Sequence, residues 1–238
     1  MQTEFFQNGI TMQQAEDLFR LGSDAMLLAD FAALPKKARV CDLCAGAGAV
    51  GLLLLARAPD CHVTAVELQA AACLLARKNV AENRLEDRMT VVEGDLRQIE
   101  TLLPNRRFDC VVCNPPYYPV GSGKAAQSEA LAAARTEQYC TLDDVCRAAA
   151  QLLNTGGCFC LVHLPGRLTD VLCTLRAHQL EPKRLRLVRH SADKAPSLLL
   201  IRTVRGGRPG LQFDPDLILH APDGSPSEEY NRIYHITE

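Results

Sequence analysis

Short apolar runs alternate with amphipathic segments along most of the chain, which is typical of a doubly wound α/β fold with a mainly parallel sheet. Seven runs rich in aliphatic residues are predicted to be strands: 38–44, 61–67, 88–94, 108–114, 157–164, 183–190 and 197–204. Segments with apolar positions three and four residues apart separate them and predict helices that pack on the sheet: 49–58, 68–83, 96–103, 141–154 and 166–179.

The two ends of the chain extend this pattern. Residues 191–196 are too few for a crossover, so the last two strands must be antiparallel and the seven-stranded sheet has one reversed strand at its end. Residues 22–34 predict a helix whose N-cap is Ser23 or Asp24. The segment 118–140 and the Pro-rich tail from Pro209 are expected to be irregular. We expect a single domain: an N-terminal extension 1–37, a core 38–204 and a tail 205–238.

The composition is that of an ordinary globular protein. The 238 residues are 47% hydrophobic and 23% charged, with no Trp. The longest apolar runs are far below the ~18–20 residues that span a bilayer, and the first residues lack the charged-then-apolar layout of a signal peptide. We therefore expect a cytoplasmic protein with no membrane contact.

Positive charge is concentrated near the C-terminus although the net charge is −2. Nine Lys and Arg residues but two acids lie between Arg176 and Arg208. A positive face for a nucleic acid and a solvated edge hairpin are equally compatible with this composition.

Eleven cysteines are scattered through predicted strands and helices, where free Cys acts as a small hydrophobe. The pairs Cys41/Cys44 and Cys110/Cys113 have the CxxC spacing of zinc ligands. Both pairs lie in predicted strands, in which residues three apart point to opposite faces of the sheet. We therefore expect no metal site.

A glycine-rich stretch, "GAGAVG", runs from Gly46 to Gly51. It matches G-x-G-x-x-G, and Glu67 lies about 20 residues further on, as in dinucleotide-binding proteins. Asp42, four residues before Gly46, favours another ligand. A carboxylate there would repel a pyrophosphate, but it would balance a ligand that carries an ammonium and a sulfonium. That ligand is S-adenosylmethionine.

Polar residues after the next strands fit the adenosine part of this cofactor. Glu67 is placed to accept hydrogen bonds from both ribose hydroxyls. Asp95 is placed to accept from the adenine amino group and Leu96 to offer its backbone, although Asp95 alone would also serve as a helix N-cap. The remaining expected cofactor contacts are Cys44, Gly46, Gly48, Leu68 and Asn114.

The fourth predicted strand ends in "NPPY", Asn114 to Tyr117. An amino group on an aromatic ring is a poor nucleophile because its lone pair is delocalised. The Asn114 side-chain oxygen and the Pro115 carbonyl would accept its two hydrogens and aim the lone pair at the donor methyl. Pro115 and Pro116 would stiffen the loop and Tyr117 would stack on the base. Taken alone, the motif would be a rigid turn with a packing Tyr.

Together "DLCAGAGAVG", "VELQ", "EGDL" and "NPPY" resemble the class I methyltransferases that modify amino groups, which implies a Rossmann-like fold. The segments "FRLGSDAMLLADF" and "ARTEQYCTLDDVCRAAAQLLNTGGCFCLVHLPGRL", with the tail "GGRPGLQFDPDLILHAPDGSPSEEYNRIY", look like bacterial tRNA adenine-N6 methyltransferases that modify the adenine 3′ of the anticodon in a valine tRNA. This resemblance covers nearly the whole chain. Cys44 and Ala47 depart from the Gly and the Ser or Thr common in that loop.

The resemblance implies roles for the flanking segments. The helix with Asp24 would cover the cofactor as a lid, unless Asp24 is only a cap. The loop 118–140 would close on substrate, the basic hairpin would hold RNA phosphates, and the target base would leave its stack to reach Tyr117. No obligate protein partner is implied. The expected RNA contacts are Tyr118, Lys124, Arg135, Arg184 and Arg186, with Glu137 in the same loop.

Other functions stay open at this point. Release-factor glutamine-N5 methylation uses the same motif, but those enzymes usually carry a helical N-terminal domain and only residues 1–37 precede the first predicted strand. DNA adenine methylation would need a target-recognition domain, for which there is no room. Guanine-N2 methylation of ribosomal RNA, a non-catalytic cofactor- or RNA-binding module and an oxidoreductase are the remaining alternatives.

Overall fold

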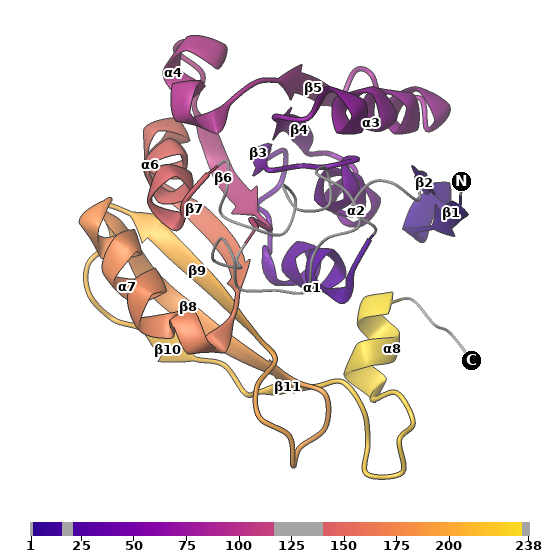
Figure 1. Ribbon diagram of the computed structural model, residues 1–238, viewed down its shortest axis with the longest axis vertical. Coiled ribbons are helices and arrows are strands. Elements are labelled where there is room, and N and C mark those ends of the chain that lie inside the picture. The colour runs from indigo at the N-terminus through magenta and orange to yellow at the C-terminus, as the bar shows by residue number, and fades with distance from the viewer. Residues whose placement is uncertain (1, 16–20, 117–139, 235–238) are drawn as a thin grey trace.

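A large mixed sheet forms the centre of the molecule (Figure 1). The computed structural model describes residues 2–15, 21–116 and 140–234. Within these residues the sheet has nine strands in the order β10-β8-β9-β7-β6-β3-β4-β5, with β11 also paired to β8. The seven predicted strands are all present: β3 (Arg39–Leu43), β4 (His62–Glu67), β5 (Met89–Glu93), β6 (Phe108–Cys113), β7 (Leu153–His163), β8 (Leu180–Arg189) and β9 (Leu198–Arg205).

Strand direction follows the prediction. β3 pairs in parallel with β4 and with β6, β4 with β5, and β6 with β7. β9 is the reversed strand, because it is antiparallel to both β7 and β8. Its predicted place at the end of the sheet is wrong, because β9 lies between β7 and β8, and β8 continues toward the edge.

Helices cover both faces of the sheet and enclose two separate apolar cores (Figure 1). The first core contains residues of α1 (Ser23–Phe31), α2 (Ala49–Arg57) and α3 (Ala70–Glu82). The second contains residues of the elements η2 (Leu96–Gln98), α4 (Ile99–Leu102), α6 (Leu142–Leu152) and α7 (Leu168–Ala177), the last preceded by η3 (Pro165–Arg167). Successive strand residues alternate between the cores, as Val40 and Cys41 do, which explains the almost continuous apolar runs.

The N-terminal extension forms a small hairpin that the sequence analysis did not predict. β1 (Gln2–Phe5) and β2 (Thr11–Gln14) are antiparallel, with the turn η1 (Gln7–Gly9) between them. The hairpin forms its own two-stranded sheet beside α2 and α3 (Figure 1).

Two further predictions are wrong: the N-cap of α1 and the absence of regular elements in the tail. α1 begins at Ser23 with Gly22 at the N-cap and no side-chain capping bond, so neither Ser23 nor Asp24 caps it. The tail from Pro209, predicted to be irregular, contains short regular elements: β10 (Gln212–Phe213) and β11 (Leu217–Ile218) pair in parallel with β8, and α8 (Glu228–Tyr234) follows. Its order comes from partners far away in the sequence, which local composition does not reveal. In the described part of the chain, no helix has both the length and the apolar character of a membrane span.

Candidate active site

The predicted cofactor and target residues follow four strands that are neighbours in the sheet. The order β6-β3-β4-β5 places the carboxyl ends of these parallel strands side by side. From β3 the chain continues by way of α2 to β4 on one side, whereas from β6 it continues by way of α6 to β7 on the other. Ligands of open α/β sheets bind where the strand order reverses in this way. The candidate site is therefore the edge outside β3 and β6.

The glycine-rich loop joins β3 to α2 at this edge. The Ala45 N–H donates to the Val66 carbonyl at 3.1 Å and the Gly48 N–H to the Ala45 carbonyl at 2.9 Å. Gly48 has φ of 87°, and a Cβ there would lie 3.1 Å from the Met89 methyl group, so this position requires glycine. Cys44 also has a positive φ, 56°.

Asp42 is buried at the end of β3, with 1% of its surface exposed. Its Oδ2 atom accepts from the Gly51 N–H at 3.1 Å, and its Oδ1 atom has no hydrogen-bond partner in the described structure. Burial, together with the negative charge of Glu67, raises the pKa of Asp42 to about 8, against the opposing effect of the Gly51 N–H. An uncompensated buried carboxylate is costly. A cationic ligand group would supply the missing partner.

Glu67 holds the loop in place from the end of β4. Its Oε2 atom accepts from the Gly46 N–H at 2.8 Å and its Oε1 atom from the Gln69 N–H at 2.8 Å. Burial raises the pKa of Glu67, and these backbone donors oppose the shift. Each oxygen keeps a lone pair for a further donor. The next residue, Leu68, is 41% exposed beside it.

Asp95 already has strong partners in this structure. It is the N-cap of η2 and accepts from the Arg97 N–H at 2.9 Å. The Arg97 side chain also binds both carboxylate oxygens, which holds the pKa of Asp95 below its usual range. An adenine amino group would share this carboxylate with Arg97. Leu96 is buried in the same turn.

Asn114 and Pro115 follow β6 directly, so they lie at the strand end next to the glycine-rich loop. Asn114 is half-buried and Pro115 is buried, with Pro116 half-buried after them. The predicted substrate residues Tyr117, Tyr118, Lys124, Arg135 and Glu137 lie outside the described residues.

Asp24 lies in the first turn of α1, close to Tyr234 of α8. α1 packs against α2, β7 and α8. The role of Asp24 over the cofactor stays a prediction.

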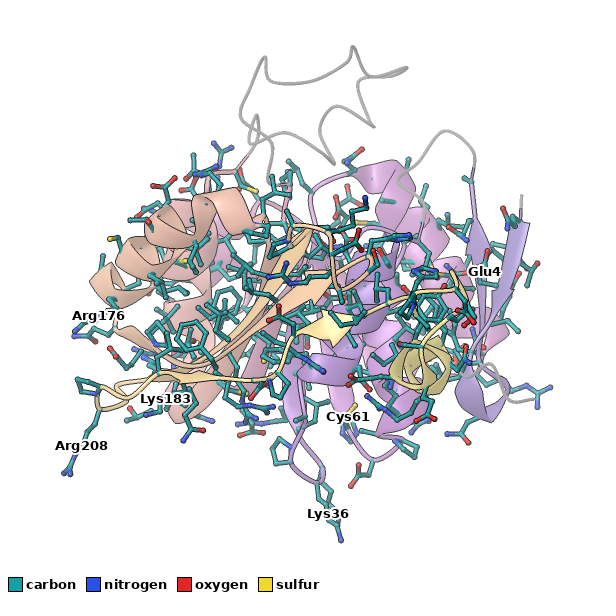
Figure 2. All side chains as sticks on the ribbon, turned by 90° about the horizontal axis from the view of Figure 1, so that it is seen from below. Glu4, Lys36, Cys61, Arg176, Lys183 and Arg208 are labelled. Atoms are coloured by element: carbon teal, nitrogen blue, oxygen red, sulfur yellow. The ribbon has the colours of Figure 1, made fainter. Side chains whose placement is uncertain are left out.

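The two arginines predicted to bind RNA are held in ion pairs with the tail. Arg184 pairs with Asp214 at 2.7 Å and lies 5.4 Å above the Phe31 ring. Arg186 makes two hydrogen bonds to Glu229, at 2.8 and 2.7 Å. Their charges are therefore already balanced. Other basic residues of this segment, Arg176, Lys183 and Arg208, gather at the end of the molecule remote from Glu4 (Figure 2).

The two CxxC pairs follow the predicted placement on opposite faces of the sheet only in part. Cys110 and Cys113 do belong to different cores. Cys41 and Cys44 instead line the same core, because Cys44 lies beyond the end of β3, and its sulfur is 4.0 Å from that of Cys140.

A cysteine cluster that the sequence analysis missed lies at the junction of β6 and β7. The sulfurs of Cys110, Cys158 and Cys160 lie within 4.8 Å of one another. Cys158 and Cys160 share a face of β7, and Cys110 is opposite Cys158 on β6. Hydrogen bonds from Cys110 and Cys160, together with Arg202, hold the pKa of the Cys158 thiol below its usual range. The C-x-C spacing of Cys158 and Cys160 was the available signal.

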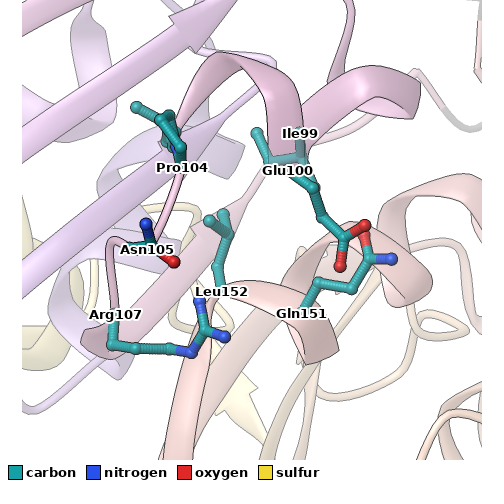
Figure 3. Close-up of a pocket in the computed structure, with 8 residues that line it drawn as sticks. Ile99, Glu100, Pro104, Asn105, Arg107, Gln151 and Leu152 are labelled. Carbon is teal, nitrogen blue, oxygen red and sulfur yellow. The ribbon is translucent and has the colours of Figure 1, made fainter.

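A shallow hollow lies away from the candidate site (Figure 3). It adjoins the amino end of β6, near Arg107, and the last turn of α6, near Gln151, so it opens at the opposite edge of the sheet. Its lining residues are Ile99, Glu100, Leu103, Pro104, Asn105, Arg107, Gln151 and Leu152.

Comparison with known proteins identifies the family. The sequence profile of the family described as "Methyltransferase small domain" matches residues 20–167. A tRNA1(Val) (adenine(37)-N6)-methyltransferase from Cronobacter sakazakii is 34% identical over 237 residues, covering 96% of this chain and 94% of that protein. A protein of the same name from Porphyromonas gingivalis is 30% identical over 222 residues, covering 90% and 86%.

Solved structures confirm the fold. A predicted O-methyltransferase from Agrobacterium tumefaciens matches with a TM-score of 0.73 at 24% identity, over 89% of this chain and 95% of that chain. TrmN from Thermus thermophilus matches with a TM-score of 0.52 at 22% identity, over 76% of this chain and 48% of that chain. At these identities the likeness concerns the fold alone.

Proposed function

Because the chain belongs to the methyltransferase small domain family, as its motifs predicted, we propose that it methylates the N6 atom of the adenine next to the anticodon in a tRNA. The methyl donor is S-adenosylmethionine. The observation that carries the proposal is the position of Asn114-Pro115-Pro116, directly after β6 and next to the strand that bears the glycine-rich loop. A target amine held there would face the donor methyl group.

Two buried carboxylates suit this cofactor. When bound, S-adenosylmethionine supplies an electrophilic methyl group on a sulfonium. The free Oδ1 atom of Asp42 provides an acceptor and a negative charge for its cationic end. Glu67 keeps acceptor capacity for the ribose hydroxyls while it fixes the loop through Gly46. Asp95, Leu96, Leu68, Cys44 and Gly48 complete the proposed contacts, and Asp24 would close over them.

Asn114 and Pro115 would act on the target amine. The Asn114 side-chain oxygen and the Pro115 backbone carbonyl oxygen would accept one amine hydrogen each, which favours a pyramidal nitrogen with its lone pair directed at the methyl group. No strong general base is needed, since the amine proton becomes acidic only as the new bond forms. Tyr117 would stack on the extruded base, with the rigid Pro115-Pro116 pair behind it.

We propose tRNA as the partner from two observations. The relatives from Cronobacter sakazakii and Porphyromonas gingivalis carry tRNA in their names, and basic side chains gather at one end of the molecule (Figure 2). Contacts by Arg184 and Arg186 would compete with Asp214 and Glu229. Lys124, Arg135 and Tyr118 are proposed as further contacts, and residues 1–238 as one domain in the cytoplasm.

The test is a methyl-transfer assay with labelled S-adenosylmethionine and three acceptors: tRNA lacking modification, ribosomal RNA and release factor. The expected product is N6-methyladenosine in tRNA, identified by nucleoside analysis. Labelled release factor, or a methylated guanine in ribosomal RNA, would keep the amine chemistry and refute the substrate. Cofactor binding without transfer to any acceptor would favour a non-catalytic module.

A further inference from the structure

The N-terminal hairpin is attached to α3 by two asparagines one helical turn apart. Asn79 Oδ1 accepts from the Gln13 N–H at 2.8 Å, and Asn79 Nδ2 donates to the Gln13 carbonyl at 3.2 Å. Asn83 binds Thr11 in the same way, at 2.8 and 2.7 Å. Residues i and i+4 of a helix lie on one face, as do residues i and i+2 of a strand. Each amide therefore closes a two-bond ring with one residue of β2.

The two asparagines differ in their remaining N–H. Asn79 Nδ2 also donates to the carbonyl oxygen of Ala47 at 3.1 Å. Asn83 Nδ2 instead donates to the Asn79 carbonyl at 2.7 Å, within the same helix. Ala47 lies in the glycine-rich loop between Gly46 and Gly48. Asn79 thus joins the hairpin to the loop, whereas Asn83 joins the hairpin only to α3.

The hydrogen bond from Asn79 to the Ala47 carbonyl restrains a part of the loop with much backbone freedom. Glycine has more backbone freedom than other residues, and both neighbours of Ala47 are glycines with positive φ. Because the peptide unit is planar, fixing the Ala47 carbonyl also fixes the Gly48 N–H, which donates to the Ala45 carbonyl at 2.9 Å. Glu67 holds the preceding residue through the Gly46 N–H. Side chains therefore hold the turn at two successive residues.

Asn79 is suited to this task by complete burial and complete pairing. It has 0% exposed surface and lies on the buried side of α3 with Ala72, Leu75 and Ala76. Its acceptor and both its N–H donors are used, so the amide has a fixed orientation. Asparagine is a poor residue for a helix interior, and Ala would be the better choice if α3 only had to form a helix.

We propose that Asn79 is a positioning residue for the cofactor loop, and that it couples docking of the N-terminal hairpin to binding of S-adenosylmethionine. Asn79 holds the Ala47 carbonyl, and so the loop, in the geometry that receives the cofactor. Cofactor binding and hairpin docking then strengthen each other, since linkage between two sites is reciprocal. The inference rests on the proposed cofactor site.

The test compares Asn79→Ala with Asn83→Ala in the full chain. Both variants lose two hairpin bonds, so both should melt at a lower temperature, and Asn79→Ala by more, because its amide is completely buried whereas Asn83 is half-buried. Asn79→Ala should bind S-adenosylmethionine about tenfold more weakly, as expected for one buried hydrogen bond. Asn83→Ala should bind within about twofold of the unaltered protein. At saturating cofactor both should keep most of their kcat, because the reacting groups are intact.

Equal affinity in all three proteins, or an equal loss in both variants, would overturn the inference. If the unaltered protein fails to bind S-adenosylmethionine, the proposed function itself is wrong, which is a separate outcome.

A second measurement avoids dependence on the folding of either variant. In the unaltered protein, NMR-detected hydrogen exchange of the Gln13 and Thr11 amides should slow on addition of S-adenosylmethionine, because cofactor binding favours the docked hairpin. Unchanged exchange of both amides would refute the coupling.

Discussion

Charged side chains occur both at the carboxyl ends of β3 and β4 and in the antiparallel strands β8 and β9. The two regions differ in the partners that these charges have. At the first edge, Asp42 and Glu67 are buried with backbone N–H donors, and neither has an ion-pair partner among the residues that the structure describes. In the second part, Arg184 and Arg186 have carboxylate partners from the tail. Charge without a counterion marks a place prepared for a charged ligand. Charge already paired within the chain chiefly holds the tail in place.

The largest effect should come from Asn114→Ala at the first edge. This change removes an acceptor that the amine needs in the transition state, so we expect kcat to fall by about 10²–10³-fold. The affinity for S-adenosylmethionine, measured by calorimetry, should change little. Preserved turnover with strongly weakened cofactor binding would show that Asn114 serves the cofactor and not the amine.

Asp42→Asn should separate function from stability at the same edge. We expect S-adenosylmethionine to bind about 10–100-fold more weakly, because a charge-assisted hydrogen bond is lost. The empty variant should melt at a higher temperature than the unaltered protein at pH 8, since it no longer buries a carboxylate. Unchanged affinity would contradict the role of the unpartnered Oδ1 atom.

The pH dependence should follow the same carboxyl group. Its pKa is raised from 3.8 to about 8 in the folded protein, so the folded state holds this proton more tightly than the unfolded state. Its contribution to stability is therefore complete below pH 3.8 and is lost as the pH rises to about 8. The advantage of Asp42→Asn should shrink between pH 8 and pH 6.

Cofactor binding should change with pH in the opposite sense. A cationic ligand favours ionised Asp42, so the affinity of the unaltered protein should fall as the pH drops from about 8 to 6, by up to about tenfold per unit. Titrations at several pH values, with Asp42→Asn as the reference, provide the check. Parallel profiles in the two proteins would exclude Asp42 as the titrating group.

The smallest effects should come from the paired arginines. Replacing Glu229 by Gln weakens the partner of Arg186, and should raise tRNA affinity about two- to threefold at low salt and steepen its dependence on salt. Arg184→Ala combined with Arg186→Ala should flatten that dependence. Filter binding of tRNA at several salt concentrations measures both. An unaltered slope in all variants would leave these arginines a purely structural role.

The sequence was sufficient for those parts of the fold that depend on local patterns. The seven strands were predicted because most are apolar runs that reach both cores, as Val40 and Cys41 illustrate, whereas β8 alternates apolar and charged residues. In the structure, the helix predicted at 96–103 is a 3₁₀ turn, η2, followed by one short helix, α4. β10 and β11 were missed because two-residue strands acquire their order only from β8.

The residue types of the candidate site were predictable, but the contacts between its side chains were not. Asp42, Glu67 and Asn114 lie at the carboxyl ends of β3, β4 and β6, so parallel topology alone brings them to one edge. The pairing of Asp95 with Arg97 depends on side-chain rotamers, and the contact of Asn79 with Ala47 joins residues 32 positions apart. A polar residue on the buried stripe of a predicted helix was the one local signal for Asn79. It was not used.

The short pairings of the tail with β8 also bear on how the protein behaves at high concentration. β8 is the last long strand of the sheet, and β10 and β11 occupy its outer side at Arg184–Leu185 and Val188–Arg189. An uncovered strand of this length would present free N–H and carbonyl groups to other copies of the chain. Removing the tail would thus expose an unpaired strand edge to other copies of the chain. The shortened protein would precipitate before its activity could be assayed.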